Sequence, residues 1–129
     1  MNSNKITVVY KWTAKPNMLD QLKVIYANVA KAMETNEPGA LAVEIFASTA
    51  ENALYVRDEF ADAGALAFHL GTTAAPHFPS LLEIAAPGTF YFFGDVPEDT
   101  QQAVLAMGLA AEFASKVTAF DRSQTPLAA

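Results

Sequence analysis

The sequence predicts an α+β domain with the ferredoxin-like order strand, helix, strand, strand, helix, strand. Residues 6–13 alternate β-branched and aromatic side chains, residues 17–36 place apolar side chains at three- and four-residue steps, and residues 41–60 hold two more alternating segments. This order puts four antiparallel strands in one sheet and two helices on one of its faces. We expect one domain over all 129 residues, with a core at about 5–96 and an extra helix and strand at about 97–123.

The first strand and the first helix follow from the N-terminal part of the chain. Alternation in the segment ITVVYKWT sends successive side chains to opposite faces of a strand. The face expected to meet the helices carries Ile6, Val8, Tyr10 and Trp12. Asn17 is the expected N-cap of the helix, with Asp20 in its first turn near the positive end of the helix dipole. The apolar stripe of this helix must be buried against the sheet.

The next two strands form a hairpin. Glu37-Pro38-Gly39 ends the first helix and leads into an alternating segment at 41–48. A turn-like sequence at 50–52 then leads into a third alternating segment at 54–60. Two adjacent strands joined by so short a turn are antiparallel.

Two short helical pieces follow the hairpin. Asp62 is the expected N-cap of a helix at about 63–70, which we expect to end at Gly71. A second helical piece is expected at about 76–84, because Pro76 is favourable at a helix start.

The last part of the chain supplies a fourth strand at 89–96, a helix at 97–107 and a final strand within 115–122. The fourth strand is aromatic on both faces, whereas a solvated sheet face is polar. The outer face of the sheet therefore needs a cover. We expect a second copy of the chain to provide it in a homodimer, and the alternative is that the C-terminal helix and strand cover it. The outward charges that border such an interface are Lys11, Glu44, Arg57 and Glu59.

Composition narrows the function classes. The net charge is −6 and the eight Lys and Arg residues are scattered, which argues against nucleic acid as a partner. The absence of cysteine removes disulfides and thiolate metal sites and favours a cytoplasmic location. Histidine and carboxylate spacing does not suggest a metal site. We see neither a signal peptide nor the roughly 18 apolar residues that cross a bilayer, so no membrane partner is expected.

Asp58 is the polar exception on the helix-facing side of the sheet. A carboxylate that faces a core is costly unless it is hydrogen-bonded, so Asp58 suggests a polar end to a cavity. The competing interpretation is that Asp58, near the end of its strand, meets solvent or accepts backbone N–H groups from the following helix.

The two histidines are the other candidates for chemistry. His69 is the titratable residue of an otherwise apolar helix, and histidine exchanges protons near neutral pH. Its alternative role is to cap carbonyls at the helix C-terminus. His77 is a second candidate, against the simpler reading of an exposed loop residue.

Aromatic residues are the candidates for the walls of a pocket. Tyr10 and Trp12 can stack on a planar ring or fill the core, and Phe60 and Phe68 have the same two readings. Catalytic motifs of acyl transfer, phosphate binding and dinucleotide binding are absent from the sequence.

One set of residues resembles a known family. The set is Glu37-Pro38-Gly39, Asp58, Phe60, Asp62, Ala65-Leu66 and His69. In type and spacing it resembles the antibiotic biosynthesis monooxygenase family of dimeric α+β barrels, over about residues 5–84. The family commonly has Glu at the position of Asp58 and Trp at that of Phe60. The C-terminal helix and strand resemble only some longer members.

The resemblance implies an enzyme that oxygenates an electron-rich aromatic, such as a hydroquinone or polyketide phenol, with O2 and without flavin, haem or metal. A deprotonated phenol can pass an electron to O2, so the protein need only bind, orient, deprotonate and exclude water. In that scheme His69 is the base or hydrogen-bond donor, and Asp58 orients His69 or the substrate. The walls are then Tyr10, Trp12, Phe60 and Phe68.

The sequence leaves other functions open. The same fold class includes haem-degrading enzymes with an Asn, Trp, His arrangement, which this chain lacks, and isomerases and decarboxylases of small aromatic or lactone substrates. A non-catalytic dimeric module that binds an apolar metabolite is a further alternative, in which His69 is structural.

Overall fold

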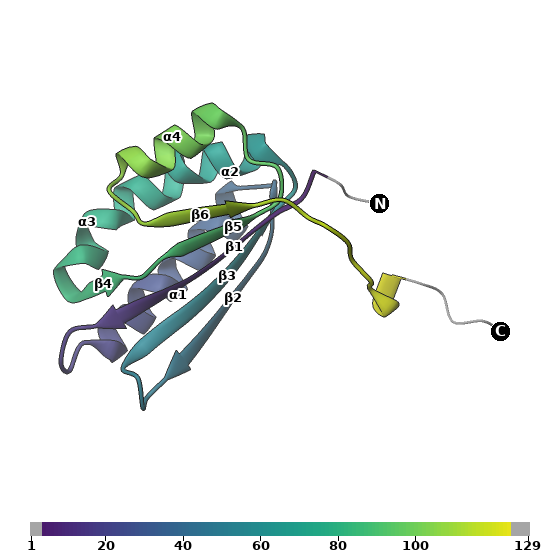
Figure 1. Ribbon diagram of the computed structural model, residues 1–129. Helices are drawn as coiled ribbons and strands as arrows, with labels where there is room; N and C mark the ends of the chain where they lie inside the picture. Colours follow the sequence, from purple (N-terminus) through teal and green to yellow (C-terminus); the bar gives the residue numbers. More distant parts are fainter. Residues whose placement is uncertain (1–3, 125–129) are drawn as a thin grey trace.

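The computed structural model describes residues 4–124 and has the expected α+β architecture (Figure 1). Its strands are β1 (Ile6–Ala14), β2 (Ala40–Ser48), β3 (Ala53–Phe60), β4 (Ala85–Pro87), β5 (Phe90–Phe93) and β6 (Ala111–Ala114). Its helices are α1 (Leu19–Asn36), α2 (Ala63–His69), the π-helical η1 (Leu70–Ala74), α3 (Ala75–Ile84), α4 (Glu98–Ala106) and the 3₁₀ turn η2 (Arg122–Gln124).

The sheet has the strand order β2-β3-β1-β5-β6, and β4 pairs with β1 beside β5. The pairs β1–β3, β2–β3 and β1–β5 are antiparallel, which confirms the ferredoxin-like core. The predicted fourth strand is present in two pieces, β4 and β5, on either side of Gly88. The register sets Val8 of β1 opposite Asp58 of β3, so both side chains lie on one face.

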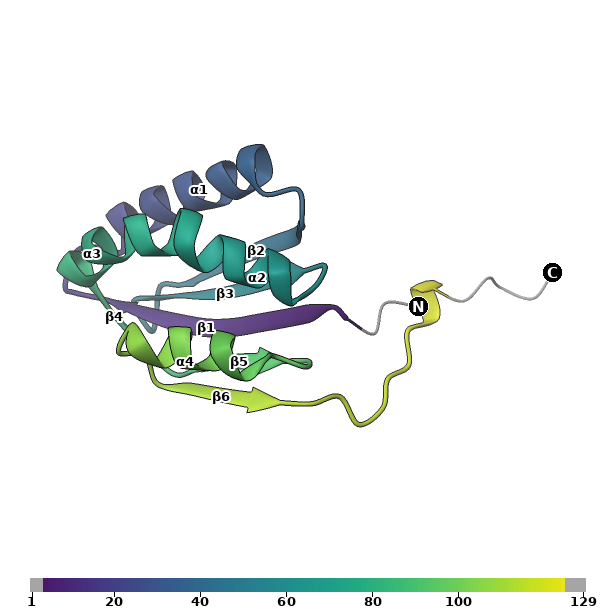
Figure 2. The ribbon, with the colours of Figure 1, turned by 90° about the horizontal axis from the view of Figure 1, so that it is seen from above.

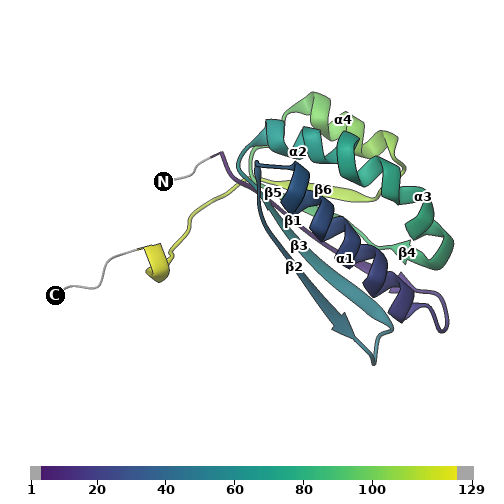
Figure 3. The ribbon, with the colours of Figure 1, turned by 180° about the vertical axis from the view of Figure 1, so that it is seen from behind.

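Helices α1, α2, α3 and α4 lie on one face of this sheet, whereas the turn η2 lies away from it (Figure 3). Strand β1 buries its predicted face against these helices. Helix α1 packs on the sheet through its buried residues, which are Leu22, Tyr26, Val29 and Met33. Side chains from every second residue of the strand pack against side chains spaced three or four residues apart on the helix, and together they form the core of the domain. Within the described residues, no helix is long and apolar enough to cross a membrane.

The opposite face of the sheet is uncovered in the described part of the chain. Helix α4 lies on the same side as α2 and α3, and β6 extends the sheet at its edge (Figures 2 and 3). The alternative in which the C-terminal helix and strand cover the outer face is therefore wrong for residues 4–124. That face leaves large side chains exposed, namely Phe46, Tyr55, Tyr91 and Phe93.

The helical run after β3 does not end at Gly71, as the sequence suggested. Residues 63–84 form a continuous α, π, α succession, in which the N–H of Ala75 donates to the carbonyl of Leu70, five residues earlier. Pro76 and Pro79 lack the N–H that α-helical pairing needs, and the wider π turn carries the chain across the junction.

Two further boundaries differ from prediction. Asn17 adopts φ = 64° in the turn before α1, so it is a turn residue, and the cap position falls on Met18 without a side-chain bond. The last strand is β6 at Ala111–Ala114, parallel to β5, and not within 115–122. Its Phe113 stacks on Phe92 with ring centroids 5.1 Å apart, which fixes β6 against the sheet.

Candidate functional site

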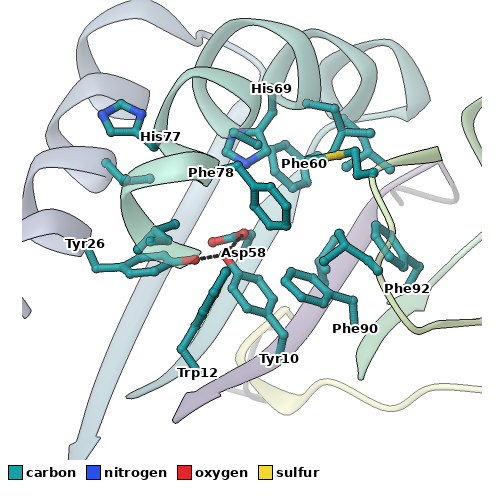
Figure 4. Close-up of a pocket in the computed structure, with 18 residues that line it drawn as sticks. Tyr10, Trp12, Tyr26, Asp58, Phe60, His69, His77, Phe78, Phe90 and Phe92 are labelled. Atoms are coloured by element: carbon teal, nitrogen blue, oxygen red, sulfur yellow. Dashed lines mark hydrogen bonds between the residues drawn. The ribbon is translucent and has the colours of Figure 1, made fainter. Parts of the chain in front are cut away.

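A cavity lies between the helix-facing side of the sheet and the α2–η1–α3 run (Figure 4). Its polar lining consists of Tyr10, Trp12, Tyr26, Asp58, His69 and His77. The rest of the lining is apolar, with Phe60, Phe78, Phe90 and Phe92 as its aromatic members. The volume is about 50 Å³, smaller than the roughly 150 Å³ that holds benzene in an engineered cavity. An aromatic guest must therefore displace lining side chains, among which Phe78 and Met107 are only part-buried.

Asp58 projects from β3 into this cavity and is only 2% exposed. Its Oδ2 accepts a hydrogen bond of 2.9 Å from the hydroxyl of Tyr10. Burial raises the pKa of Asp58 from 3.8 to about 6, although His69 and Tyr10 both favour its ionised form. Asp58 is thus able to exchange a proton close to neutral pH, and the interpretation in which it meets solvent is wrong.

The phenols behind Asp58 form a short hydrogen-bonded chain. Tyr26 of α1 donates to the hydroxyl of Tyr10 at 3.5 Å, and Tyr10 donates in turn to Asp58. Burial and the neighbouring carboxylate raise the pKa of Tyr10 well above its ordinary value, so it remains a donor. The Tyr10 ring stacks on Phe90 with centroids 4.2 Å apart, and Trp12 meets Phe90 edge-on.

His69 lies across the cavity in a second polar group. Its Nδ1 is 3.1 Å from Oε2 of Glu37, which also accepts a bond from the hydroxyl of Thr73. Burial alone would raise the pKa of Glu37, but the contacts with His69 and Thr73 outweigh it and hold that pKa below its usual range. An ionised carboxylate only accepts, so Nδ1 of His69 is the donor in this contact, and Nε2 is the ring nitrogen that Glu37 does not engage.

Local sequence explains how Glu37 and His69 meet. Asp62 caps α2 by accepting from the N–H of Ala65 at 2.8 Å, as expected. The Glu37-Pro38-Gly39 turn packs closely on that first turn, because a Cβ added to Gly39 would lie 2.5 Å from the Cβ of Ala65. Only glycine allows this approach, and it brings the end of α1 beside the helix that carries His69.

The structure separates the two residues that the sequence put forward for catalysis. Asp58 and His69 line the same cavity, yet each is hydrogen-bonded to a different partner, Tyr10 and Glu37. His77 also lines the cavity, and its Nδ1 donates to the carbonyl of Thr73 at 2.8 Å.

The aromatic predictions divide into three that line the cavity and one that does not. Tyr10, Trp12 and Phe60 line it, and the ring of Phe60 lies 5.1 Å from that of His69. Phe68 does not line the cavity, so the prediction that it forms part of the wall is wrong. It immediately precedes His69 on α2, so the helical turn of about 100° per residue directs it outward, where it is 50% exposed.

Three polar residues were not singled out from the sequence. In the sequence Glu37 belongs to the expected turn, Thr73 lies between the two expected helical pieces, and Tyr26 lies in the first helix outside its expected apolar stripe. A usable signal was present, since His69, Thr73 and His77 recur every four residues and so share one face of a helix. Within residues 4–124, no group of three or more His, Cys, Asp or Glu side chains is arranged to hold a metal ion.

Solved structures with the same fold include characterised and uncharacterised proteins. The chain is similar to MupZ from Pseudomonas fluorescens, with a TM-score of 0.76, 19% identity, and coverage of 96% of this chain and 99% of MupZ. SnoaB, a cofactor-independent oxygenase from Streptomyces nogalater, gives a TM-score of 0.60 at 16% identity, over 73% of this chain and 95% of SnoaB. A putative antibiotic biosynthesis monooxygenase from Caulobacter crescentus gives 0.62 at 23% identity, over 74% and 93%.

Sequence comparison is more specific about the family. No curated protein matches the chain in sequence. The model of the antibiotic biosynthesis monooxygenase family, however, matches residues 5–79, more than half of the 129 residues. That span contains β1 to η1 and part of α3, and with them Asp58, Glu37 and His69. The chain belongs to the antibiotic biosynthesis monooxygenase family.

Proposed function

We propose that this protein is a cofactor-independent monooxygenase that acts on a hydroquinone or a polyketide-like aromatic. The observation that carries the proposal is a cavity with aromatic walls that holds two buried acid–base units, His69 with Glu37 and Asp58 with Tyr10. Perturbed ionisable groups in a largely apolar pocket are typical of active sites. Family membership and the fold shared with SnoaB support the same reaction class.

The reaction follows from proton removal. His69 takes the phenolic proton at Nε2, while Glu37 stabilises the resulting imidazolium through Nδ1. The electron-rich phenolate passes one electron to O2, and the phenoxyl radical and superoxide recombine with formation of a C–O bond at a C–H carbon of the ring. The resulting peroxide takes back the proton held by His69 and becomes a hydroperoxide. Loss of water from that hydroperoxide leaves a carbonyl, so one oxygen atom enters the product and the other leaves as water.

The remaining lining supplies binding and exclusion of water. Tyr10, Trp12 and Phe60 contact the faces and edges of a flat guest, and Asp58 holds a polar substituent. His77, fixed by the Thr73 carbonyl, borders the same space beside α3. The apolar lining helps to keep water away from the radical pair.

The functional unit is a homodimer formed through the outer sheet face. Four large side chains are exposed there, and Tyr91 and Phe93 stack with centroids 6.2 Å apart. The face also carries both signs of charge, including the pair Arg57–Glu44 at 3.2 Å, which suits pairing with an identical surface. Exposed apolar patches of this kind mark interaction sites.

The absence of cysteine is the basis for placing the protein in the reducing cytoplasm.

Oxygen consumption tests the reaction. Wild type and His69→Ala are incubated with a panel of hydroquinones in a chelator-treated buffer, with Glu34→Gln, exposed on α1, as the control variant. We expect oxygen uptake above the spontaneous rate for at least one substrate, retained by Glu34→Gln and lost in His69→Ala. Absence of uptake for every hydroquinone, or uptake unaffected in His69→Ala, contradicts the proposal. Saturable binding without turnover would instead identify a metabolite-binding module.

A further inference from the structure

We propose that Asp58 and Trp12 form a subsite that recognises a second oxygen substituent of the substrate, remote from the one that His69 deprotonates. The unpaired Oδ1 of Asp58 accepts a hydrogen bond from a substrate hydroxyl, and the indole Nε1–H of Trp12 donates to a substrate oxygen. The inference deepens the proposed function and rests on it for the nature of the reaction.

The argument begins with polar atoms that lack partners. Within residues 4–124, the buried side-chain atoms without a hydrogen bond are Nε1 of Trp12, Oε1 of Glu37 and Oδ1 of Asp58. Leaving such a group unsatisfied costs about 1–3 kcal/mol, so native proteins rarely do so without a reason. Trp12 and Asp58 line the cavity, and both side chains are nearly fully buried. A ligand in the cavity is the available partner for Oδ1 of Asp58. The indole N–H of Trp12 neighbours the hydroxyl of Tyr26 without a hydrogen bond of normal geometry, so it can donate to the same ligand.

The other polar groups at this end of the cavity are already engaged. The hydroxyl of Tyr26 donates to that of Tyr10, and Tyr10 donates to Oδ2 of Asp58. These bonds hold the carboxylate in place and leave one acceptor and one donor to specify a guest. A group that both donates and accepts, such as a hydroxyl, matches that pair.

The position of the subsite sets the substrate class. In the view of Figure 4, Asp58 lies between the imidazole of His69 and the indole of Trp12. A flat guest that presents one hydroxyl to Nε2 of His69 thus places its far end among Asp58, Tyr10 and Trp12. The favoured substrates carry oxygens on opposite sides of the ring system, as 1,4-dihydroxy aromatics do, and monophenols are disfavoured.

Binding without oxygen tests this inference apart from turnover. Affinities for 1,4-dihydroxynaphthalene and 1-naphthol are measured anaerobically by calorimetry for wild type, Trp12→Phe and Asp58→Leu. Trp12→Phe keeps an aromatic ring but removes the indole N–H, and Asp58→Leu keeps a branched side chain but removes the carboxylate. Tyr91→Phe on the outer face is the matched control. A site built to bond a hydroxyl discriminates strongly against the analogue that lacks it. We expect wild type and Tyr91→Phe to prefer the diol by about tenfold or more, and each cavity variant to reduce that preference to about threefold or less.

The outcomes separate the two proposals. If wild type binds both compounds equally, or if the preference persists in Trp12→Phe and in Asp58→Leu, the subsite is refuted. His69→Ala is expected to keep the preference for the diol while it loses oxygen uptake. A diol preference that depends on Trp12 and Asp58, found together with no oxygen uptake by wild type, supports the subsite and contradicts the oxygenase assignment.

Discussion

Glu37 and His69 are 32 positions apart in the sequence, and their side chains meet in the interior with Oε2 and Nδ1 3.1 Å apart. One comes from the end of α1 and the other from the end of α2, and the glycine-dependent contact of Gly39 with Ala65 holds the two elements together. A carboxylate bonded to one imidazole nitrogen fixes the tautomer and leaves the other nitrogen for chemistry.

The first prediction concerns Glu37→Gln. The amide keeps the shape of the side chain but removes the charge that stabilises a protonated His69, so we expect oxygen-dependent turnover to fall by about tenfold or more. The rate is measured against Glu34→Gln, a change of the same type on the exposed side of α1. Equal turnover in the two variants would show that Glu37 has only a structural role.

The second prediction concerns pH and Asp58. The pKa of Asp58 is about 6 in the fold against 3.8 without it, so the folded state binds more protons than the unfolded state between these values. The free energy of unfolding should therefore decrease as pH rises from about 4 to about 6. The contribution of Asp58 over this range is on the order of 3 kcal/mol.

Asp58→Asn removes that contribution and leaves the other carboxylates unchanged. Urea unfolding of wild type and Asp58→Asn is compared at pH 4 and pH 7, and the variant should lose less stability than wild type over the interval. Glu37 and Glu59, whose pKa values are lowered, act in the opposite direction and are common to both chains. Parallel stability curves would contradict the burial of an ionisable Asp58.

The third prediction uses two glycines. Gly39→Ala places a Cβ 2.5 Å from that of Ala65, and we expect a loss of about 1–3 kcal/mol in the free energy of unfolding. Gly71→Ala has no atom within 4 Å of its new Cβ and lies in a helical segment, so it should be neutral or stabilising by about 0.5–1 kcal/mol. Chemical denaturation measures both. The reverse order of stabilities would contradict the close turn contact.

The fourth prediction addresses the outer sheet face. Phe93→Glu places a charge on the exposed aromatic surface, so we expect the dimer to dissociate at concentrations at which wild type remains dimeric. Phe68→Glu alters a similarly exposed phenylalanine on the helical side and should leave the dimer intact. Light scattering after size-exclusion chromatography gives the masses. A monomeric wild type, or the same mass for both variants and wild type, argues against this interface.

Much of the fold was predictable because the signals are local. Alternation along β1 assigned Tyr10 and Trp12 to the buried face, and the capping residue Asp62 located the start of α2. The errors arose where local signals conflict with longer-range structure. Gly71 is a common helix terminator, yet the π turn continues past it, and β6 is a four-residue segment that depends on pairing with β5.

The site was only partly predictable. The burial of Asp58 and His69 could be inferred from their apolar neighbours, but their partners could not, because Tyr10 and Glu37 reach them through tertiary packing. Phe68 was misplaced because an all-apolar helix does not reveal from sequence which of its sides is exposed.

The most direct measurement is the fate of the oxygen atoms. Wild type is given an accepted hydroquinone under ¹⁸O2 in chelator-treated buffer, and the product is analysed by mass spectrometry beside that of His69→Ala. The account predicts one ¹⁸O atom in each product molecule formed by wild type, and no labelled product above background with His69→Ala. Product labelled only from H₂¹⁸O, or equal labelling with His69→Ala, would contradict it.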